Sequence, residues 1–395
     1  MTLSVWADVG GTFTDCFVRD AKSRGEIKVL SSGIVRASVN ELVDSRTLRL
    51  DPFPGSETDG FWVGAMAWLL QSGGRRVRLG AITSQRGDRL GLAEDVLNRF
   101  QRDPTEAPNR AAPRQRAKVI ELVAGIEAPV LATRLLLHRP LGQSLPPLDV
   151  RLGTTRGTNA LLTRQGSPTA LLVTQGFGDV LRIGEQDRPD LFALEIKKHP
   201  PLTQDVIEVR ERIDARGNVL LPIDLDQLRA DLQQARARGI QSLAICLLHS
   251  HVNDQHERQA QAVAQELGFP EISASSEVAP LIKLVSRAET TTLDAYLNPI
   301  LAGYVREVWE QFGGEPACNL RLMTSGGNLV APAAFRGRDS ILSGPAGGVV
   351  ALGHVARVAK VPSVVGLDMG GTSTDVSRFE GQVGRRYESR VAGIR

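Results

Sequence analysis

The chain of 395 residues has few cysteines, no long apolar run and little net charge. Its three cysteines, Cys16, Cys246 and Cys318, are isolated and form no Cys-x-x-Cys pair, so neither a metal knuckle nor a disulfide framework is expected. No run of about 18 apolar residues occurs and no basic segment opens the chain, which argues against a membrane span and a signal peptide. A net charge of +3 gives no general case for nucleic acid or an anionic membrane as partner. These absences favour the reducing cytoplasm.

The composition itself is that of an ordinary globular protein. Hydrophobic residues make up 42% of the chain and charged residues 23%, both close to the usual values. The length exceeds that of one ordinary domain, so we expect two or more.

One eight-residue phrase occurs twice, at residues 8–15 and 368–375, and the copies agree at six of the eight positions. Each copy follows a short β-rich apolar run, so we interpret both as β-hairpins whose tight turn is Gly-Gly-Thr. Two glycines let the backbone approach a ligand closely, and successive turn N–H groups form an anion-binding concavity. One copy alone could be a plain turn. Two copies predict a clamp on one polyphosphate.

Three segments in the first half have patterns of their own. Residues 61–71 predict an apolar helix, and residues 90–100 an amphipathic helix with apolar residues at four-residue spacing. Residues 101–118 are rich in proline and arginine and fit either an exposed loop or a basic docking site for acidic groups. All three belong to a predicted insertion at residues 30–147.

The second half alternates between strand and helix patterns. This alternation predicts a parallel sheet with crossover helices. The expected strands are 169–174, 206–212, 242–248 and 271–275, and the expected helices are 224–238 and 254–267. A long helix at 290–312, bent or broken near Pro299, and a helix at 343–359 follow.

Two further polar groups leave alternatives open. His249, His251 and His256 fit either a metal site or loop and capping histidines. The segment that leads into a short helix at 159–164 could present donors to an anion, or Thr158 or Asn159 could simply cap the helix.

The paired hairpin phrase resembles the phosphate-binding signature of the actin, sugar-kinase and heat-shock-chaperone ATPases. A narrower resemblance, to the hydantoinase A / 5-oxoprolinase family, runs in order from residue 4 to residue 395, and only residues 21–147 match poorly. It departs from the usual pattern at Arg156-Gly157 and at residues 325–328. The motifs that carry it are 7–15, 152–155, 158–162, 176–184, 188–192, 341–348 and 366–377.

The resemblance implies an α/β fold of actin-like ATPase (ribonuclease H-like) domains, the second one incomplete. It divides the chain into an N-terminal region at 1–272 and the start of a hydantoinase A domain at 289–395, which carries the second phosphate loop. Elements that grip adenosine would follow the second hairpin, so a truncated chain is expected. The implied partner is a hydantoinase B-type domain or subunit, fused or separate.

The resemblance also implies ATP and Mg²⁺ as cofactors, and ATP-dependent cleavage of 5-oxoproline, a compound of the glutathione cycle, or of a hydantoin-type lactam. The amide carbonyl oxygen would be phosphorylated before hydrolysis. Asp8 and Asp368 would be catalytic and would hold Mg²⁺, mostly through water, while Asp15 and Asp375 would only brace the hairpins. The expected phosphate-binding residues are Gly10, Gly11, Thr12, Thr14, Gly370, Gly371, Thr372 and Thr374. A small-molecule kinase and an ATP-switched interaction protein are the alternatives.

Overall fold

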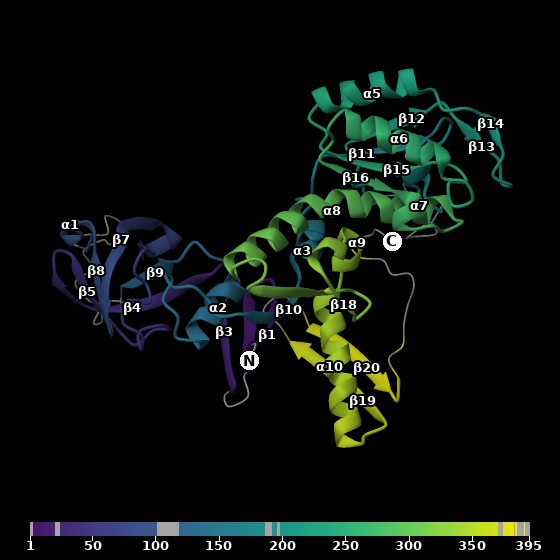
Figure 1. The fold of residues 1–395 in the computed structure, drawn as a ribbon. Coiled ribbons are helices and arrows are strands. Elements are labelled where there is room, and N and C mark those ends of the chain that lie inside the picture. The colour runs from purple at the N-terminus through teal and green to yellow at the C-terminus, as the bar shows by residue number, and fades with distance from the viewer. Residues whose placement is uncertain are drawn as a thin grey trace.

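The protein consists of a central α/β core with a β-barrel at one end and a parallel-sheet domain at the other (Figure 1). The computed structural model describes residues 3–19, 24–100, 118–185, 192–195, 198–369, 374–382, 384 and 391. Within these ranges, no helix combines the length and the apolarity needed to cross a bilayer.

The core is built on a six-stranded sheet of order β18-β17-β10-β1-β2-β3. The first three strands form an antiparallel meander, β10 and β17 run parallel to β1, and β18 closes the edge antiparallel to β17. The predicted first hairpin is therefore confirmed. The strands are β1 (Leu3–Val9), β2 (Phe13–Arg19), β3 (Arg24–Leu30), β10 (Leu148–Thr154), β17 (Cys318–Met323) and β18 (Leu329–Val330).

The two faces of this sheet differ because side chains alternate along each strand. One face packs into the main core with α2 (Ala128–Leu136) and α8 (Leu284–Gln311). The other face carries Trp6 and Phe17 and is only partly covered. The alternation in β1 thus decides which residues build the core and which face a ligand or partner.

A closed six-stranded barrel, of order β4-β5-β8-β7-β6-β9, lies within residues 34–123. Its strands are β4 (Ile34–Asp44), β5 (Thr47–Leu50), β6 (Met66–Leu70), β7 (Arg76–Arg86), β8 (Arg89–Leu92) and β9 (Val119–Val123), with η1 (Ser72–Gly74) between β6 and β7. Residues 101–117, most of the basic segment, lie outside the described residues.

Both helices predicted in this region are wrong. Residues 61–71 form turns and then β6, whose burial alternates along the strand. Residues 90–100 contain β8 and only one helical turn, α1 (Leu97–Phe100). Leu90 and Leu92 are both buried at the two-residue spacing of a strand, and Val96 is buried in the segment between β8 and α1. Barrel closure pairs these segments with distant strands, and this tertiary pairing overrides the local pattern.

The parallel-sheet domain has the predicted alternation of strands and helices. Its sheet has the order β12-β11-β15-β16 with every pair parallel. One core packs the sheet against α5 and α6, and another packs it against α8. The elements are β11 (Thr169–Thr174), β12 (Asp205–Val209), β15 (Ser242–Cys246), β16 (Glu271–Ala274), α5 (Leu225–Ala237) and α6 (Gln255–Glu266). Smaller elements are α3 (Arg156–Leu162), α4 (Val180–Ile183), α7 (Ser275–Val278) and the hairpin β13 (Arg212–Ile213) with β14 (Val219–Leu221).

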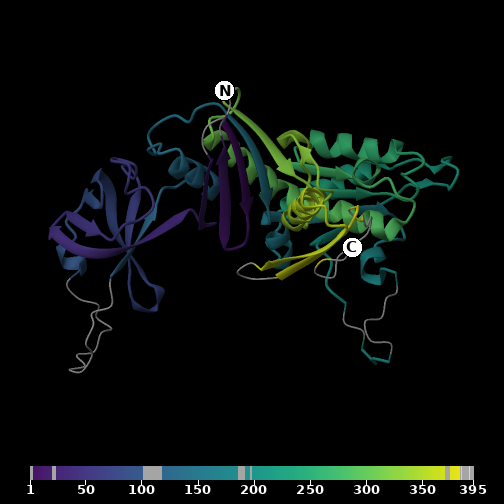
Figure 2. The same cartoon turned by 90° about the horizontal axis from the view of Figure 1, so that it is seen from below.

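Helix α8 links this domain to the core and runs through Pro299 as one helix. After β17 and β18 come η2 (Pro332–Ala334), α9 (Gly337–Ser340) and α10 (Ser343–Ala359), which matches the predicted bounds. The second hairpin, β19 (Ser363–Met369) and β20 (Thr374–Glu380), is a separate two-stranded sheet beside α10 (Figure 2).

Candidate phosphate-binding site

The first glycine loop is a tight turn held by its own backbone and by Ser31. The Gly10 N–H donates to the Phe13 carbonyl at 3.0 Å, and a Cβ at Gly10 would lie 3.0 Å from the same oxygen. Gly11 and Thr12 are exposed, so their polar groups are open to a ligand. The Ser31 hydroxyl donates to the Gly10 carbonyl at 2.8 Å, which fixes the turn from behind.

Thr14 differs from Thr12 in its surroundings. It is fully buried, and its hydroxyl lies 3.0 Å from Ser31 Oγ. The buried Thr14 hydroxyl therefore stabilises the turn, whereas Thr12 lies on the exposed side of the turn. The pattern of the phrase alone could not distinguish the two threonines, because Ser31 comes 17 residues after Thr14, beyond β3.

The second hairpin repeats the register of the first. Asp8 pairs with Asp15 across the first hairpin, and Asp368 pairs with Asp375 across the second. Thr374 is exposed at the start of β20. Three of the predicted phosphate-binding residues, Gly370, Gly371 and Thr372, lie outside the described residues.

The electrostatics of Asp8 connect the two hairpins. Nearby protein atoms exclude water from the Asp8 carboxylate, and this loss of hydration raises its pKa. Part of the residue remains exposed. The charges of Asp15 and Asp368 raise the pKa further, while Lys28 opposes them. Burial is the largest of these causes, and the charge of Asp368 follows that of Asp15.

The segment before α3 ties the first hairpin to α10. The Thr155 N–H donates to the Val9 carbonyl at 2.9 Å, and the Ser343 hydroxyl donates to the Thr154 carbonyl at 2.8 Å. The Leu342 N–H donates to the Thr158 hydroxyl at 3.2 Å. Thr158 and Asn159 lie inside α3 and make no cap, so the capping interpretation is wrong for both.

The first turn of α10 reaches Asp8. A Cβ at Gly344 would lie 3.8 Å from Asp8 Oδ1 and 3.3 Å from the Thr155 methyl. Only a residue without a side chain leaves this approach open. The small residues at 343–348 were the signal for this contact, but the sequence did not say which partner they meet.

A cavity of about 690 Å³ opens beside Asp8 on the partly covered face of the core sheet. Trp6 and Phe17 form an edge-to-face pair with centroids 5.6 Å apart, and the Arg151 guanidinium stacks 5.1 Å above Trp6. Lys28 forms an ion pair with Asp15 at 2.7 Å, so Asp15 braces the meander as expected. The cavity has the size and the apolar lining of a small-molecule site.

The histidine group does not form a metal site. Among the described residues, no cluster of three or more His, Cys, Asp or Glu side chains is arranged to hold a metal ion. The His256 Nδ1 lies 2.7 Å from Glu211 Oε2 and both residues are buried. His251 contacts Arg287 instead.

Comparison with known proteins agrees with this geometry. The family model described as the hydantoinase/oxoprolinase N-terminal region matches residues 110–268, and the model described as hydantoinase/oxoprolinase matches residues 287–395. The chain is 37% identical to 5-oxoprolinase 1 of Arabidopsis thaliana over 297 residues, which is 68% of this chain and 24% of that protein. The chain thus spans about a quarter of the length of such curated relatives.

Two solved structures share the fold. The nucleotide-free structure of acetone carboxylase, from work on ATP-dependent acetone carboxylation, superposes with a TM-score of 0.60 at 21% identity, covering 96% of this chain and 44% of that one. The ATP-dependent caprolactamase from Pseudomonas jessenii gives a TM-score of 0.58 at 20% identity, covering 95% and 43%. The predicted actin-like α/β fold class is confirmed. On these matches, the chain belongs to the hydantoinase/oxoprolinase family.

Proposed function

We propose that this chain carries the phosphoryl-transfer site of an ATP-dependent enzyme that opens a cyclic amide of the 5-oxoproline or hydantoin type. The observation that supports the proposal most is the approach of α10 to Asp8, since a Cβ at Gly344 would lie 3.8 Å from Asp8 Oδ1. The same helix packs on β19 and β20, so it links two hairpins of identical register. A polyphosphate held between two such loops is the arrangement that the repeated phrase predicts.

The chemistry explains why a cyclic amide would need ATP. An unstrained lactam resists hydrolysis because resonance stabilises its amide. Transfer of the γ-phosphoryl group to the carbonyl oxygen turns that oxygen into a leaving group. One water then adds to the same carbon and the C–N bond breaks, so the nitrogen leaves as an amine and an acyl phosphate remains. A second water attacks the carbonyl carbon of the acyl phosphate and releases phosphate, which carries the original amide oxygen. Phosphoryl transfer needs mainly positioning and charge neutralisation, and both can come from a rigid protein frame.

The residues of the first loop have distinct roles in this proposal. The exposed N–H of Gly11 donates to a phosphate oxygen, and the Thr12 hydroxyl adds a donor at the open side. Gly10, whose N–H is bound to the Phe13 carbonyl, lets the backbone come close to the phosphate. Thr14 holds the turn through Ser31 rather than touching the ligand. We propose matching roles for Gly370, Gly371 and Thr372, with Thr374 at the end of that loop.

The site fits a divalent cation. Asp8 and Asp368 are two carboxylates that repel each other, with Lys28 as the cation that lowers the pKa of Asp8. Oxygen ligands of this kind suit Mg²⁺, which keeps several waters and binds through one or two carboxylates plus phosphate oxygens. When bound between Asp8 and Asp368, Mg²⁺ would neutralise charge on the transferred phosphoryl group.

The relatives supply the substrate class. The Arabidopsis relative is named a 5-oxoprolinase, and the Pseudomonas jessenii structure is an ATP-dependent caprolactamase. Both names concern cyclic amides. We propose a hydantoinase B-type domain or subunit as partner for the hydrolysis step, a functional division at residues 1–272 and 289–395, and the cytoplasm as location.

Isotope transfer tests the phosphorylation step. The chain, together with a hydantoinase B-type protein, is supplied with Mg-ATP and 5-oxoproline labelled with ¹⁸O at the ring carbonyl. The expected result is one ¹⁸O in each released phosphate, with the ring opened. Asp8→Asn should reduce turnover by roughly 10²–10³-fold, as the loss of one electrostatic contact in a transition state typically does. Asp88→Asn, on the barrel, is the matched control and should leave turnover unchanged.

Other outcomes point to other functions. Accumulation of a phosphorylated substrate with an intact ring would identify a small-molecule kinase. Hydrolysis of ATP that responds to unfolded peptide and not to a lactam would identify an interaction protein. Either result would overturn the proposed cyclic amidase.

A further inference from the structure

A second group of functional residues lies at the carboxyl edge of the parallel-sheet domain. From β11 the chain first goes to β12 on one side and later to β15 on the other. The strand order therefore reverses between β11 and β15, and the loops that leave these two strands diverge. In open parallel sheets, ligands bind outside the carboxyl ends of the strands at such a reversal.

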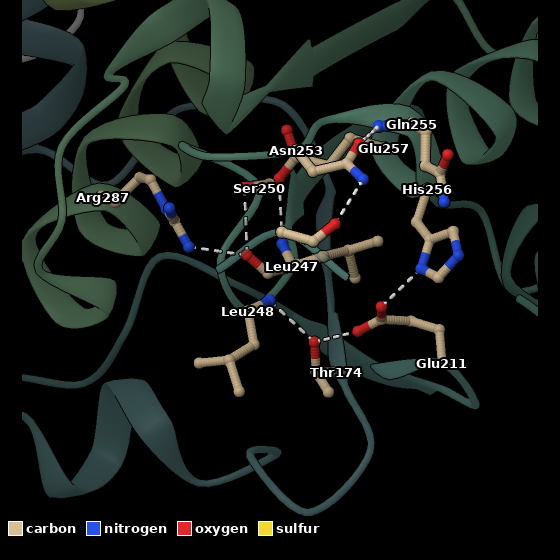
Figure 3. A network of polar contacts seen from close by, with 11 residues as sticks. Thr174, Glu211, Leu247, Leu248, Ser250, Asn253, Gln255, His256, Glu257 and Arg287 are labelled. Atoms are coloured by element: carbon tan, nitrogen blue, oxygen red, sulfur yellow. Dashed lines mark hydrogen bonds and ion pairs between the residues drawn. The ribbon is translucent and has the colours of Figure 1, made fainter. Parts of the chain in front are cut away.

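Two buried carboxylates brace the loop that follows β15 (Figure 3). The Thr174 hydroxyl, at the end of β11, donates to Glu211 and accepts from the Leu248 N–H at 2.8 Å. Glu211 also holds His256 at 2.7 Å. All of these side chains except Leu248 are at most 2% exposed.

Glu257 holds the same loop from the other side. It accepts from the Leu247 N–H at 2.9 Å, from the Ser275 hydroxyl at 2.6 Å and from the Ser276 N–H at 2.8 Å. The Arg287 guanidinium donates to the Leu247 carbonyl at 2.6 Å. With both backbone groups of Leu247 fixed, the start of the loop is held rigidly.

This bracing holds His249 in an unfavourable backbone conformation. Its φ is +61°, in the left-handed region that few residues other than glycine adopt. Such strain persists only where the surroundings over-determine it, and it concentrates at functional sites. The next histidine, His251, lies close by, with ring centroids 6.1 Å apart. Both are half-buried, so each retains a solvent-facing part.

Arg287 is the charged side chain in direct contact with His251, whereas the buried carboxylates Glu211 and Glu257 bind His256 and the loop backbone. Arg287 is 1% exposed, and among the described residues no carboxylate forms a salt bridge with it. Its Nη1 donates to His251 Nδ1 at 2.9 Å, and its Nε has no hydrogen-bond partner within the described part of the chain. Because a guanidinium can only donate, His251 Nδ1 accepts, and the proton of the neutral ring sits on Nε2. Burial and the charges of Arg287 and His249 lower the pKa of His251, which keeps the ring in this form at neutral pH.

We propose that the carboxyl edge between β11 and β15 binds the carboxylate group of a small molecule, with His249 and His251 as donors. The fixed tautomer of His251 presents an N–H that can donate to a carboxylate oxygen, and the charged group that contacts His251 directly is the guanidinium of Arg287. A carboxylate has two oxygens and can bridge two rings at this separation. The site is separate from the glycine hairpins and needs no nucleotide.

An NMR titration of the 395-residue chain with labelled histidines tests the site. Sodium acetate is added at constant ionic strength, with sodium chloride as the blank and inorganic phosphate as the second anion. The expected result is a saturable shift of the His249 and His251 ring signals with acetate. Absence of saturation, or tighter binding of phosphate than of acetate, would overturn the proposed carboxylate site.

A matched pair of variants separates binding from folding. His249→Gly relieves the left-handed strain, so its Tm should stay or rise while the acetate Kd increases at least tenfold. His138, outside this domain, is also left-handed, with φ of +50°. His138→Gly should keep or raise Tm in the same way and leave the acetate Kd unchanged. Equal affinity in His249→Gly and the parent would refute the site.

A third variant keeps this test apart from the proposed phosphoryl transfer. Asp8→Asn should bind acetate as the parent does, because Asp8 lies in the core and not in the parallel-sheet domain. Loss of the acetate response in Asp8→Asn would contradict the independence of the two sites. Loss of ATP-dependent turnover with acetate binding intact would concern the hairpins alone.

Discussion

The two glycine hairpins have the same phrase and the same register, yet they are covered on opposite faces. In the first, the apolar residues before the loop are at most 5% exposed: Val5, Ala7 and Val9. In the second, the equivalent residues are Val365, Leu367 and Met369, which are 64%, 74% and 81% exposed. One hairpin is a central part of a six-stranded sheet, whereas the other forms a two-stranded sheet in the described part of the chain and packs on α10.

The opposite faces of the two hairpins explain this difference in exposure. On the first hairpin this face carries Trp6 and Phe17, which stand beside the cavity. On the second, the equivalent residues are Gly366 and Ser377, and α10 packs directly on them: a Cβ at Gly366 would lie 3.1 Å from Leu352. Small residues therefore let α10 pack on the second hairpin, whereas large residues occupy the equivalent positions of the first. Two copies of one phrase can therefore join differently packed strands, because the phrase and the strand faces are specified by separate residues.

The largest expected difference concerns the equivalent valines. Val5→Asp places an unpaired charge in the core and should lower the free energy of unfolding by at least about 3 kcal/mol. Val365→Asp adds a charge to an exposed face and should change it by about 0.5 kcal/mol or less. Urea denaturation, with hydrogen exchange resolved to β1 and β19, measures both. Equal losses would mean that the exposed face of β19 is covered in solution.

The next expected effect treats the two hairpins as functional equals. Asp8→Asn and Asp368→Asn should each weaken binding of magnesium tripolyphosphate by about 10–100-fold, as the loss of an outer-sphere ligand does. The double variant should lose less than the product, because both carboxylates serve one cation. Calorimetry on the 395-residue chain measures this without requiring an adenosine site. Asp88→Asn, which removes only an ion pair with Arg49 on the barrel, is the control.

The sequence predicted the parallel-sheet domain almost residue by residue, because its signals are local. The strand 169–174 is a continuous apolar run with the bounds of β11, and Asp224 caps α5 by accepting from the Gln227 N–H. The helices predicted in the barrel region were wrong for the opposite reason. Its strand β6 is specified by pairing with β7 and β9, and an apolar run such as 61–71 fits a helix equally well on its own.

The candidate site was predictable only in its repeated part. The phrase points to Asp8 and Asp368 as candidates, since two matched copies are visible without a structure. The contact of Gly344 with Asp8, the burial of Thr14 and the charge coupling between the hairpins depend on how distant elements pack. A sequence pattern lists donors and acceptors, but only the packing decides which of them face the ligand.

A smaller effect tests how α10 packs on the second hairpin. Gly366→Ala would place a Cβ 2.7 Å from Ser377 Oγ and 3.1 Å from Leu352, so these two side chains must move, at a cost of about 1 kcal/mol. Hydrogen exchange along α10 should report the loosening. The equivalent change on the open face, Trp6→Phe, should leave exchange in α10 unaltered. If hydrogen exchange along α10 is as slow in Gly366→Ala as in the parent, small residues are not what allows α10 to pack on this hairpin.

The smallest expected effect follows from the raised pKa of Asp8. Below the ordinary value of 3.8, the carboxyl is neutral whether the chain is folded or unfolded, so it adds no cost. As the pH rises through 3.8 toward the raised pKa, only the unfolded chain ionises freely, and the folded state loses stability. Asp8→Asn should therefore give a slightly higher Tm than the parent at pH 7, and the difference should vanish near pH 3.

The same titration can break the comparison between the hairpins. Asp368→Asn removes one of the charges that raise the pKa of Asp8, so the carboxyl of Asp8 should titrate at lower pH in this variant, as measured by carbon-13 NMR. Asp95→Asn, on the far side of the molecule in the barrel region, should not move it. An unchanged pKa of Asp8 in Asp368→Asn would mean that the hairpins do not share one space. The two copies of the phrase would then be separate turns, and a clamp on a single polyphosphate would be impossible.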